Sequence, residues 1–142
     1  MIKLSNINME FHGKQILHDI NLEIAQGETM VIIGPSGSGK STILRLIIGL
    51  LKPTEGEIMV KDQEISDLSE EQLNKVRMDM GMVFQYSALF DSMTVGENVA
   101  FGLREHTAMS EKEISKIVSR NLRMVGLGEQ QDRMPNELSG GM

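Results

Sequence analysis

The segment GPSGSGKST, residues 34–42, decides the fold, because it matches the pattern G-x-x-x-x-G-K-[ST]. A short apolar run, residues 30–33, precedes it and is typical of a strand buried on both faces. A helical pattern of apolar residues follows it, formed by Ile43, Leu44, Leu46, Ile47, Leu50 and Leu51. A strand, a glycine-rich loop and a helix in this order form the context in which the pattern binds phosphate.

The residue types of this loop predict a nucleotide and a metal ion. Glycines let consecutive backbone N–H groups turn toward phosphates, and the following helix directs its positive end at them. We expect Lys40 to bridge the β- and γ-phosphates and Ser41 to hold Mg²⁺. The alternatives are a plain Gly/Ser turn and a dinucleotide fingerprint, although Thr42 stands where the third glycine of that fingerprint would be. The predicted nucleotide-binding residues are Gly34, Pro35, Ser36, Gly37, Ser38, Gly39, Lys40, Ser41 and Thr42.

Length and composition exclude several classes of protein. The 142 residues are near the common size of one domain, and 40% are hydrophobic, too many for a disordered chain. The net charge of −6 argues against nucleic acid as the main partner, and the absence of cysteine excludes disulfides. No apolar run approaches the roughly 20 residues of a spanning helix, so we expect a soluble chain.

Further strands and helices are predicted on both sides of the loop. Residues 2–9 and 16–24 alternate in polarity around a turn at Gly13, and two more short strands are expected within residues 53–60 and 80–85. Capping-box spacings predict helix starts at Ser69, with Gln72, and at Ser110, with Glu113. The apolar face of the second helix is formed by Ile114, Ile117, Val118, Leu122 and Val125.

Three features together resemble the ATP-binding subunit of an ATP-binding-cassette (ABC) transporter. They are the phosphate loop, the segment MVFQYSALFDSMTVGENVAFGL at residues 82–103, and LSGG at residues 138–141. The resemblance implies that Gln85 contacts Mg²⁺ and the attacking water, and that residues 86–98 contact a transmembrane permease. It also implies that Ser139, Gly140 and Gly141 approach a phosphate on a second ATPase subunit in a head-to-tail dimer. Without the other two features, Gln85 would be interpreted as a surface residue and LSGG as a turn.

The resemblance also places an aromatic ring near the adenine base. Phe11 lies in MEFHGKQIL, where the family carries a stacking ring, and the alternative is a phenylalanine of the core. His12 and His18 show no metal-ligand spacing and are interpreted as surface or structural residues.

Other catalytic groups of the family follow LSGG, namely an aspartate, a glutamate and a histidine. The run Ala88–Asp91 resembles a strand ending in an acid, but it lies in the expected permease-contacting loop and is rejected. The sequence therefore resembles the N-terminal part of a longer subunit, and we expect residues 1–142 alone to be inactive. Residues 1–84 would form part of the nucleotide-binding core, and residues 85–142 the glutamine loop and a helical subdomain.

The predicted fold class is α/β, an ABC-type P-loop NTPase with an antiparallel β piece, a helical subdomain and an incomplete core sheet. Met142 and the absence of proline after Leu89-Phe90 resemble the Mla, or organic-solvent-resistance, branch that handles lipids. The implied function is ATP hydrolysis that powers transport of a phospholipid or another hydrophobic substrate, at the inner face of the cell membrane. Amino-acid or methionine transporters, a soluble ABC ATPase acting on DNA or ribosomes, and a silent nucleotide-binding fragment are the alternatives.

Overall fold

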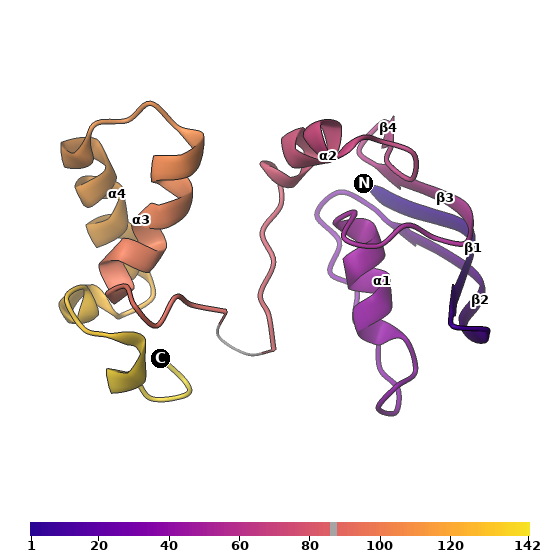
Figure 1. Cartoon of the computed structure of the whole chain (residues 1–142), viewed down its shortest axis with the longest axis horizontal. Coiled ribbons are helices and arrows are strands. Elements are labelled where there is room, and N and C mark those ends of the chain that lie inside the picture. The colour runs from indigo at the N-terminus through magenta and orange to yellow at the C-terminus, as the bar shows by residue number, and fades with distance from the viewer. Residues whose placement is uncertain (86–87) are drawn as a thin grey trace. The chain divides into compact units, whose positions relative to one another are not determined.

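The structure is a computed structural model that describes residues 1–85 and 88–142. The chain divides into two compact units, Met1–Met82 and Val83–Met142, and each unit is described by itself (Figure 1). No helix among the described residues is both long and apolar enough to cross a membrane.

The first unit contains a four-stranded antiparallel sheet in the order β2-β1-β3-β4. Strands β1 (Ile2–Phe11) and β2 (Lys14–Ile24) form the predicted hairpin, and its turn contains Gly13 at φ 78°. Strand β3 (Glu55–Val60), also predicted, pairs with β1, and the short β4 (Gln63–Glu64) pairs with β3. Alternating side chains of the strands point to opposite faces, so one face supplies the core.

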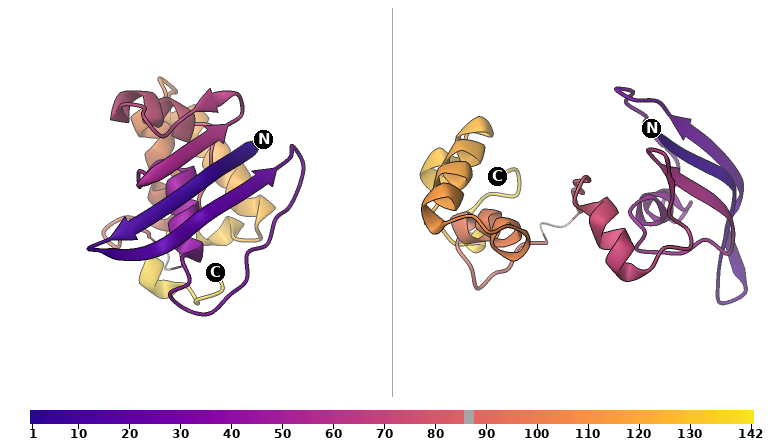
Figure 2. Two further views of the ribbon diagram at one scale, coloured as in Figure 1. Left: turned by 90° about the vertical axis from the view of Figure 1, so that its right-hand side faces the viewer. Right: turned by 90° about the horizontal axis from the view of Figure 1, so that it is seen from above.

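Two helices of the first unit, α1 (Lys40–Ile47) and α2 (Glu70–Arg77), share this core. Figure 2 shows α1 lying across one face of the sheet. Helix α1 ends four residues before the predicted Leu51, because Gly49 adopts the left-handed φ of 67° that terminates an α-helix. The buried core comprises Leu4, Ile7, Met9, Leu17, Ile43, Leu46, Ile47, Ile58, Val60, Ile65 and Leu73.

The predicted strand at residues 30–33 is wrong. These residues form no strand, and the side chains of Val31 and Ile33 are 77% and 88% exposed. The strand predicted within residues 80–85 is also wrong, with Val83 96% exposed. A strand requires a hydrogen-bonded neighbour, and the only pairings among the described residues are the three antiparallel ones. Residues 1–85 and 88–142 therefore form no parallel strand pair.

The second unit is helical. Helices α3 (Val95–His106) and α4 (Glu111–Met124) enclose a small core and are followed by the 3₁₀ turns Gly128–Gln130 and Pro135–Glu137. The capping boxes predicted at Ser69 and Ser110 are both present. Val125 was expected on the buried face of α4, but it follows the last helical turn and is exposed. The core residues are Val95, Ala100, Ile114, Val118 and Leu122.

Candidate nucleotide site

The predicted phosphate loop connects the extended segment before Gly34 to α1. Its last glycine, Gly39, is the N-cap of α1 at φ 90° and is buried. A Cβ at this position would lie 2.6 Å from Leu17 Cδ2 and 3.3 Å from Ile16 Cγ2. The 2.6 Å distance is too short for a real contact, so Leu17 or the loop would have to move, and positive φ is a glycine conformation. The loop therefore approaches β2 so closely that only glycine fits at this turn.

Gly37 supplies the second left-handed turn of the loop, at φ 80°, where a Cβ would meet no atom within 4 Å. The N–H of Ser38 donates to the carbonyl of Pro35 at 3.3 Å and closes a tight turn. Positive φ at alternating positions turns successive N–H groups toward one side of a loop, which is how backbone nests bind anions. The side chains from Pro35 through Ser38 are exposed, so a phosphate group can reach this surface.

Lys40 lies at the first position of α1, and its ammonium turns back over the loop. Its Nζ donates to the carbonyl oxygens of Gly34 and Pro35 at 2.8 and 2.7 Å, and to Ser38 Oγ at 3.4 Å. A positive charge is thereby held at the mouth of the loop by the loop's own backbone. A compact ammonium with three donors suits phosphate oxygens.

The start of α1 carries no side-chain cap, because its N-cap residue is glycine. The first N–H groups of a helix have no partner within the helix, and the helix dipole adds positive potential there. Ser41 and Thr42 follow in the first turn, with Ser41 exposed and Thr42 partly buried. A glycine cradle, a lysine and an uncapped helix start together fit a nucleotide phosphate chain.

Phe11 ends β1, and its ring is 37% exposed, so it is not a core phenylalanine. His12 and His18 are both exposed, and His18 Nδ1 lies 3.0 Å from Gln15 Nε2. In the part of the chain that the structure describes, no cluster of three or more His, Asp or Glu side chains could hold a metal ion. The loop, Phe11 and both histidines belong to the first unit.

Gln85 and the LSGG segment belong to the second unit. Gln85 lies at a bend and is exposed, while Tyr86 and Ser87 of the expected permease-contacting loop lie outside the described residues. Ser139, Gly140 and Gly141 are exposed, and the N–H of Met142 donates to the carbonyl of Ser139 at 2.9 Å. The last four residues of the expected loop, 95–98, are the first turn of α3 instead, because Thr94 and Glu97 form a capping box.

Asn98 is an organising residue that the sequence interpretation missed. Its Oδ1 accepts from the N–H of Phe90 at 2.8 Å, and its Nδ2 donates to the carbonyls of Phe90, Met93 and Thr94 at 3.0–3.1 Å. The rings of Phe90 and Phe101 also pack with centroids 4.8 Å apart. Helix α3 therefore fixes the segment that precedes it. In the sequence, the capping-box spacing of Thr94 and Glu97 was the available signal that a helix starts at this point.

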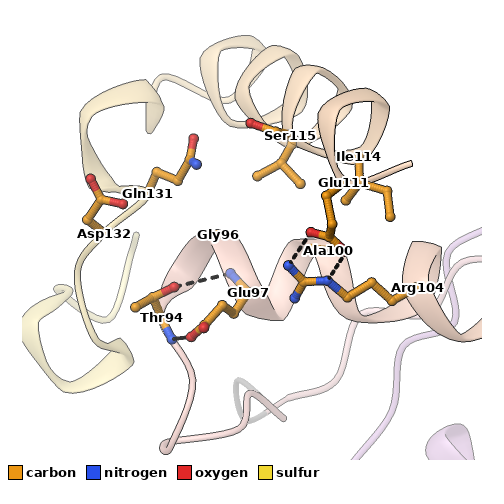
Figure 3. Close-up of a pocket in the computed structure, with 11 residues that line it drawn as sticks. Thr94, Gly96, Glu97, Ala100, Arg104, Glu111, Ile114, Ser115, Gln131 and Asp132 are labelled. Carbon is orange, nitrogen blue, oxygen red and sulfur yellow. Dashed lines mark hydrogen bonds and ion pairs between the residues drawn. The ribbon is translucent and has the colours of Figure 1, made fainter. Parts of the chain in front are cut away.

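A cavity of about 450 Å³ lies in the helical unit (Figure 3). At its edge, Arg104 donates to both carboxylate oxygens of Glu111, at 3.0 and 2.8 Å. These hydrogen bonds lower the pKa of the Glu111 carboxyl and raise the pKa of Arg104. The lining residues are Thr94, Gly96, Glu97, Ala100, Arg104, Glu111, Ile114, Ser115, Val118, Gln131 and Asp132.

Comparison with known proteins decides the family. The family model described as ABC transporter matches residues 17–142. The chain belongs to the ABC transporter family. The dimeric structure of the ATP-binding cassette MJ0796 bound to ADP and Pi superposes with a TM-score of 0.90 at 40% identity, covering 99% of this chain and 64% of that one. The predicted ABC ATPase fold class is confirmed by this likeness.

The relatives of this ABC chain have names that refer to different transport systems. They include MlaF, the ATP-binding protein of an intermembrane phospholipid transport system in Haemophilus influenzae, at 44% identity over 100% of this chain. The methionine import protein MetN of Clostridioides difficile is also 44% identical, over 99%. The probable ribonucleotide transport protein mkl of Mycobacterium leprae is 43% identical over 99%. The chain spans 54%, 44% and 41% of their respective lengths. The expected resemblance to the Mla branch is confirmed, and identity alone does not separate it from methionine import.

Proposed function

We propose that this protein is the ATP-binding and hydrolysing subunit that powers an ABC transporter. The phosphate loop carries the proposal, because Gly39 fits under β2 only as glycine and Lys40 is held over the loop at the uncapped start of α1. Membership of the ABC transporter family and the likeness to an ATP-binding cassette support it.

Individual roles follow from the chemistry of each group. Lys40 stabilises the charge of the β- and γ-phosphates, and the N–H groups of residues 34–42 bind their oxygens. The Ser41 hydroxyl and the Gln85 amide oxygen are oxygen ligands of the kind that Mg²⁺ takes, and such an ion neutralises developing phosphate charge when bound. Gln85 orients the attacking water, and the exposed ring of Phe11 stacks on adenine.

The proposed assembly is a head-to-tail dimer of ATPase subunits on a transmembrane permease. The exposed Ser139–Gly141 segment presents backbone N–H groups, which suit the γ-phosphate held by the other subunit. The loop between Gln85 and α3 contacts the permease at the cytoplasmic face of the membrane. Of the named relatives, MlaF favours a phospholipid or another hydrophobic molecule as the substrate.

Residues 1–142 alone are proposed not to hydrolyse ATP. Phosphoryl transfer depends on positioning and on electrostatic stabilisation of the transferred group. Lys40, Ser41 and Gln85 supply part of that set. Residues 1–84 and 85–142 are proposed as a nucleotide-binding part and a helical part.

The decisive experiment is calorimetric titration of the full-length protein with Mg-ATP. Lys40→Ala removes the ammonium from the phosphates, and we expect the affinity to fall by on the order of a hundredfold or more. The matched control is Lys52→Ala, which removes an exposed lysine paired with Asp67 at 2.6 Å and should bind ATP like the parent. Equal affinity of the Lys40→Ala variant and the parent would refute the assignment.

A further inference from the structure

The start of α3 is bound to the segment that leads to LSGG. The N–H of Val95 donates to the carbonyl of Arg133, and the N–H of Gly96 donates to the carbonyl of Gln131, both at 2.8 Å. The first N–H groups of a helix lack partners within it, so these two bonds satisfy donors that the helix leaves free. Two points of the backbone, 35 or more residues apart in sequence, are thereby held at hydrogen-bond distance.

Gly96 makes this approach possible because it has no side chain. A Cβ at Gly96 would lie 2.6 Å from Gln131 Cγ and 3.1 Å from the carbonyl oxygen of Gln131. Gly96 is buried, and its helical backbone does not itself require glycine. The Gln131 side chain is fixed from the other side, since Ser119 Oγ of α4 donates to its Oε1 at 3.0 Å. Gln131 therefore lies between the two helices (Figure 3).

The chain between Arg133 and the LSGG segment is also fixed. The N–H of Met134 donates to Glu137 Oε2 at 2.7 Å, and the N–H of Leu138 donates to the carbonyl of Pro135 at 3.1 Å. Leu138 packs against the core of the helical unit. Residues 131–133 are thus joined to Ser139 by a short, hydrogen-bonded turn.

We propose that Gly96 is a positioning residue for the LSGG segment, acting through Gln131. The absence of a side chain at Gly96 sets how closely residues 131–133 approach α3, and this spacing holds Ser139, Gly140 and Gly141 where they meet a phosphate. The inference deepens the proposed function and rests on it. Gly96 itself touches no nucleotide, so its role is in turnover and not in nucleotide binding at the phosphate loop.

The test is Gly96→Ala in the full-length protein, with Gly102→Ala as the matched control. Both glycines lie in α3, and a Cβ at Gly102 would meet no atom within 4 Å. Both substitutions replace a glycine of this helix by alanine. We expect Gly96→Ala to lower kcat by on the order of tenfold to a hundredfold, the scale of a small misplacement at a reacting centre. The Kd for ATP without Mg²⁺, measured by calorimetry, should match that of the parent, and Gly102→Ala should match the parent in both quantities.

Two further variants separate positioning from misfolding. Gly96→Ala combined with Gln131→Ala removes the Cγ atom that the new methyl group meets, so kcat should recover in part. Ser119→Ala removes only the hydrogen bond that fixes Gln131, and it should lower kcat by about threefold with Kd unchanged. Asn121→Ala, an exposed position on the same helix, is its control.

The outcomes distinguish the inference from the proposed function. If the parent shows no Lys40-dependent turnover, the proposed function fails. If the parent turns over, equal kcat values for Gly96→Ala and Gly102→Ala overturn the positioning role. Equal kcat values for Ser119→Ala and Asn121→Ala overturn it as well, even where Gly96→Ala does not fold. A fall in kcat that Gln131→Ala partly reverses, with Kd unchanged, supports it.

Discussion

The starts of α1 and α3 show opposite solutions to the same problem. Each helix begins with N–H groups that need acceptors. At α3, Thr94 and Glu97 form a capping box, and two further N–H groups donate to carbonyls of residues 131 and 133. At α1, the N-cap is Gly39, which offers no side-chain acceptor. The protein thus binds its own chain at the start of α3, whereas the start of α1 carries no side-chain cap, which suits the proposed phosphate ligand.

The sequence also distinguishes the proposed phosphate-binding helix start from the other helix starts. In the described part of the chain, the α-helices other than α1, namely α2, α3 and α4, each follow a Ser or Thr N-cap with a Gln or Glu three residues later. Such self-capped starts have already satisfied their donors and gain little from an anion. Glycine at the start of α1 gives up this local stabilisation, and the lysine over the loop adds charge in its place.

The largest effect is expected from Gly39→Ala, which changes the N-cap residue at the uncapped start of α1. The new Cβ would meet Leu17 Cδ2 at 2.6 Å in a backbone with φ 90°, so the substitution strains the loop and displaces it or Leu17. We expect ATP affinity, measured by calorimetry, to fall by on the order of a hundredfold. Gly13→Ala is the control, because it has a similar positive φ of 78° with no atom within 4 Å of the new Cβ. Similar ATP affinity in both variants would mean that the close approach to β2 is not needed.

A smaller effect is expected from Asn98→Ala, which weakens the self-bound region at α3. The substitution removes one acceptor and three donated hydrogen bonds that hold residues 90–94. We expect the free energy of unfolding of the helical unit to fall by about 1–2 kcal/mol, since part of the loss is recovered from water. Chemical denaturation followed by circular dichroism measures it, with the exposed Asn121→Ala as control. If Asn98→Ala lowers the free energy of unfolding no more than Asn121→Ala does, residues 90–94 keep their structure without the Asn98 side chain.

The smallest effect concerns pH and the capping box of α4. Glu113 accepts hydrogen bonds from the N–H and Oγ of Ser110 at 2.8 and 2.6 Å, which lower the pKa of its carboxyl. A lowered folded-state pKa stabilises the protein above the pKa of the unfolded chain, about 4.3, and this stabilisation is lost as pH falls through the folded value. Glu113→Gln should therefore show a shallower loss of unfolding free energy between about pH 5 and pH 3. If the unfolding free energies of variant and parent change equally with pH, the lowered pKa of Glu113 is contradicted.

Local signals in the sequence predicted the local structure. Ser69 and Ser110 start helices as their spacing indicates, because a capping box depends only on residues within one turn. Alternating polarity predicted β1 and β2, because the two strands are neighbours in sequence and pair across a turn of only two residues, His12 and Gly13. The strands expected at residues 30–33 and 80–85 are wrong, because a short apolar run does not say which strand lies beside it.

The sequence alone determined where the phosphate loop is predicted, since Gly39, Lys40 and Ser41 have the identity and spacing of the phosphate-binding pattern. Only the tertiary structure decided why Gly39 and Gly96 must be glycine. Each meets atoms from a distant part of the chain, Leu17 in one case and Gln131 in the other. Such contacts are fixed by how strands and helices pack, which no local pattern encodes, and so the link between α3 and the LSGG segment appears only in the folded protein.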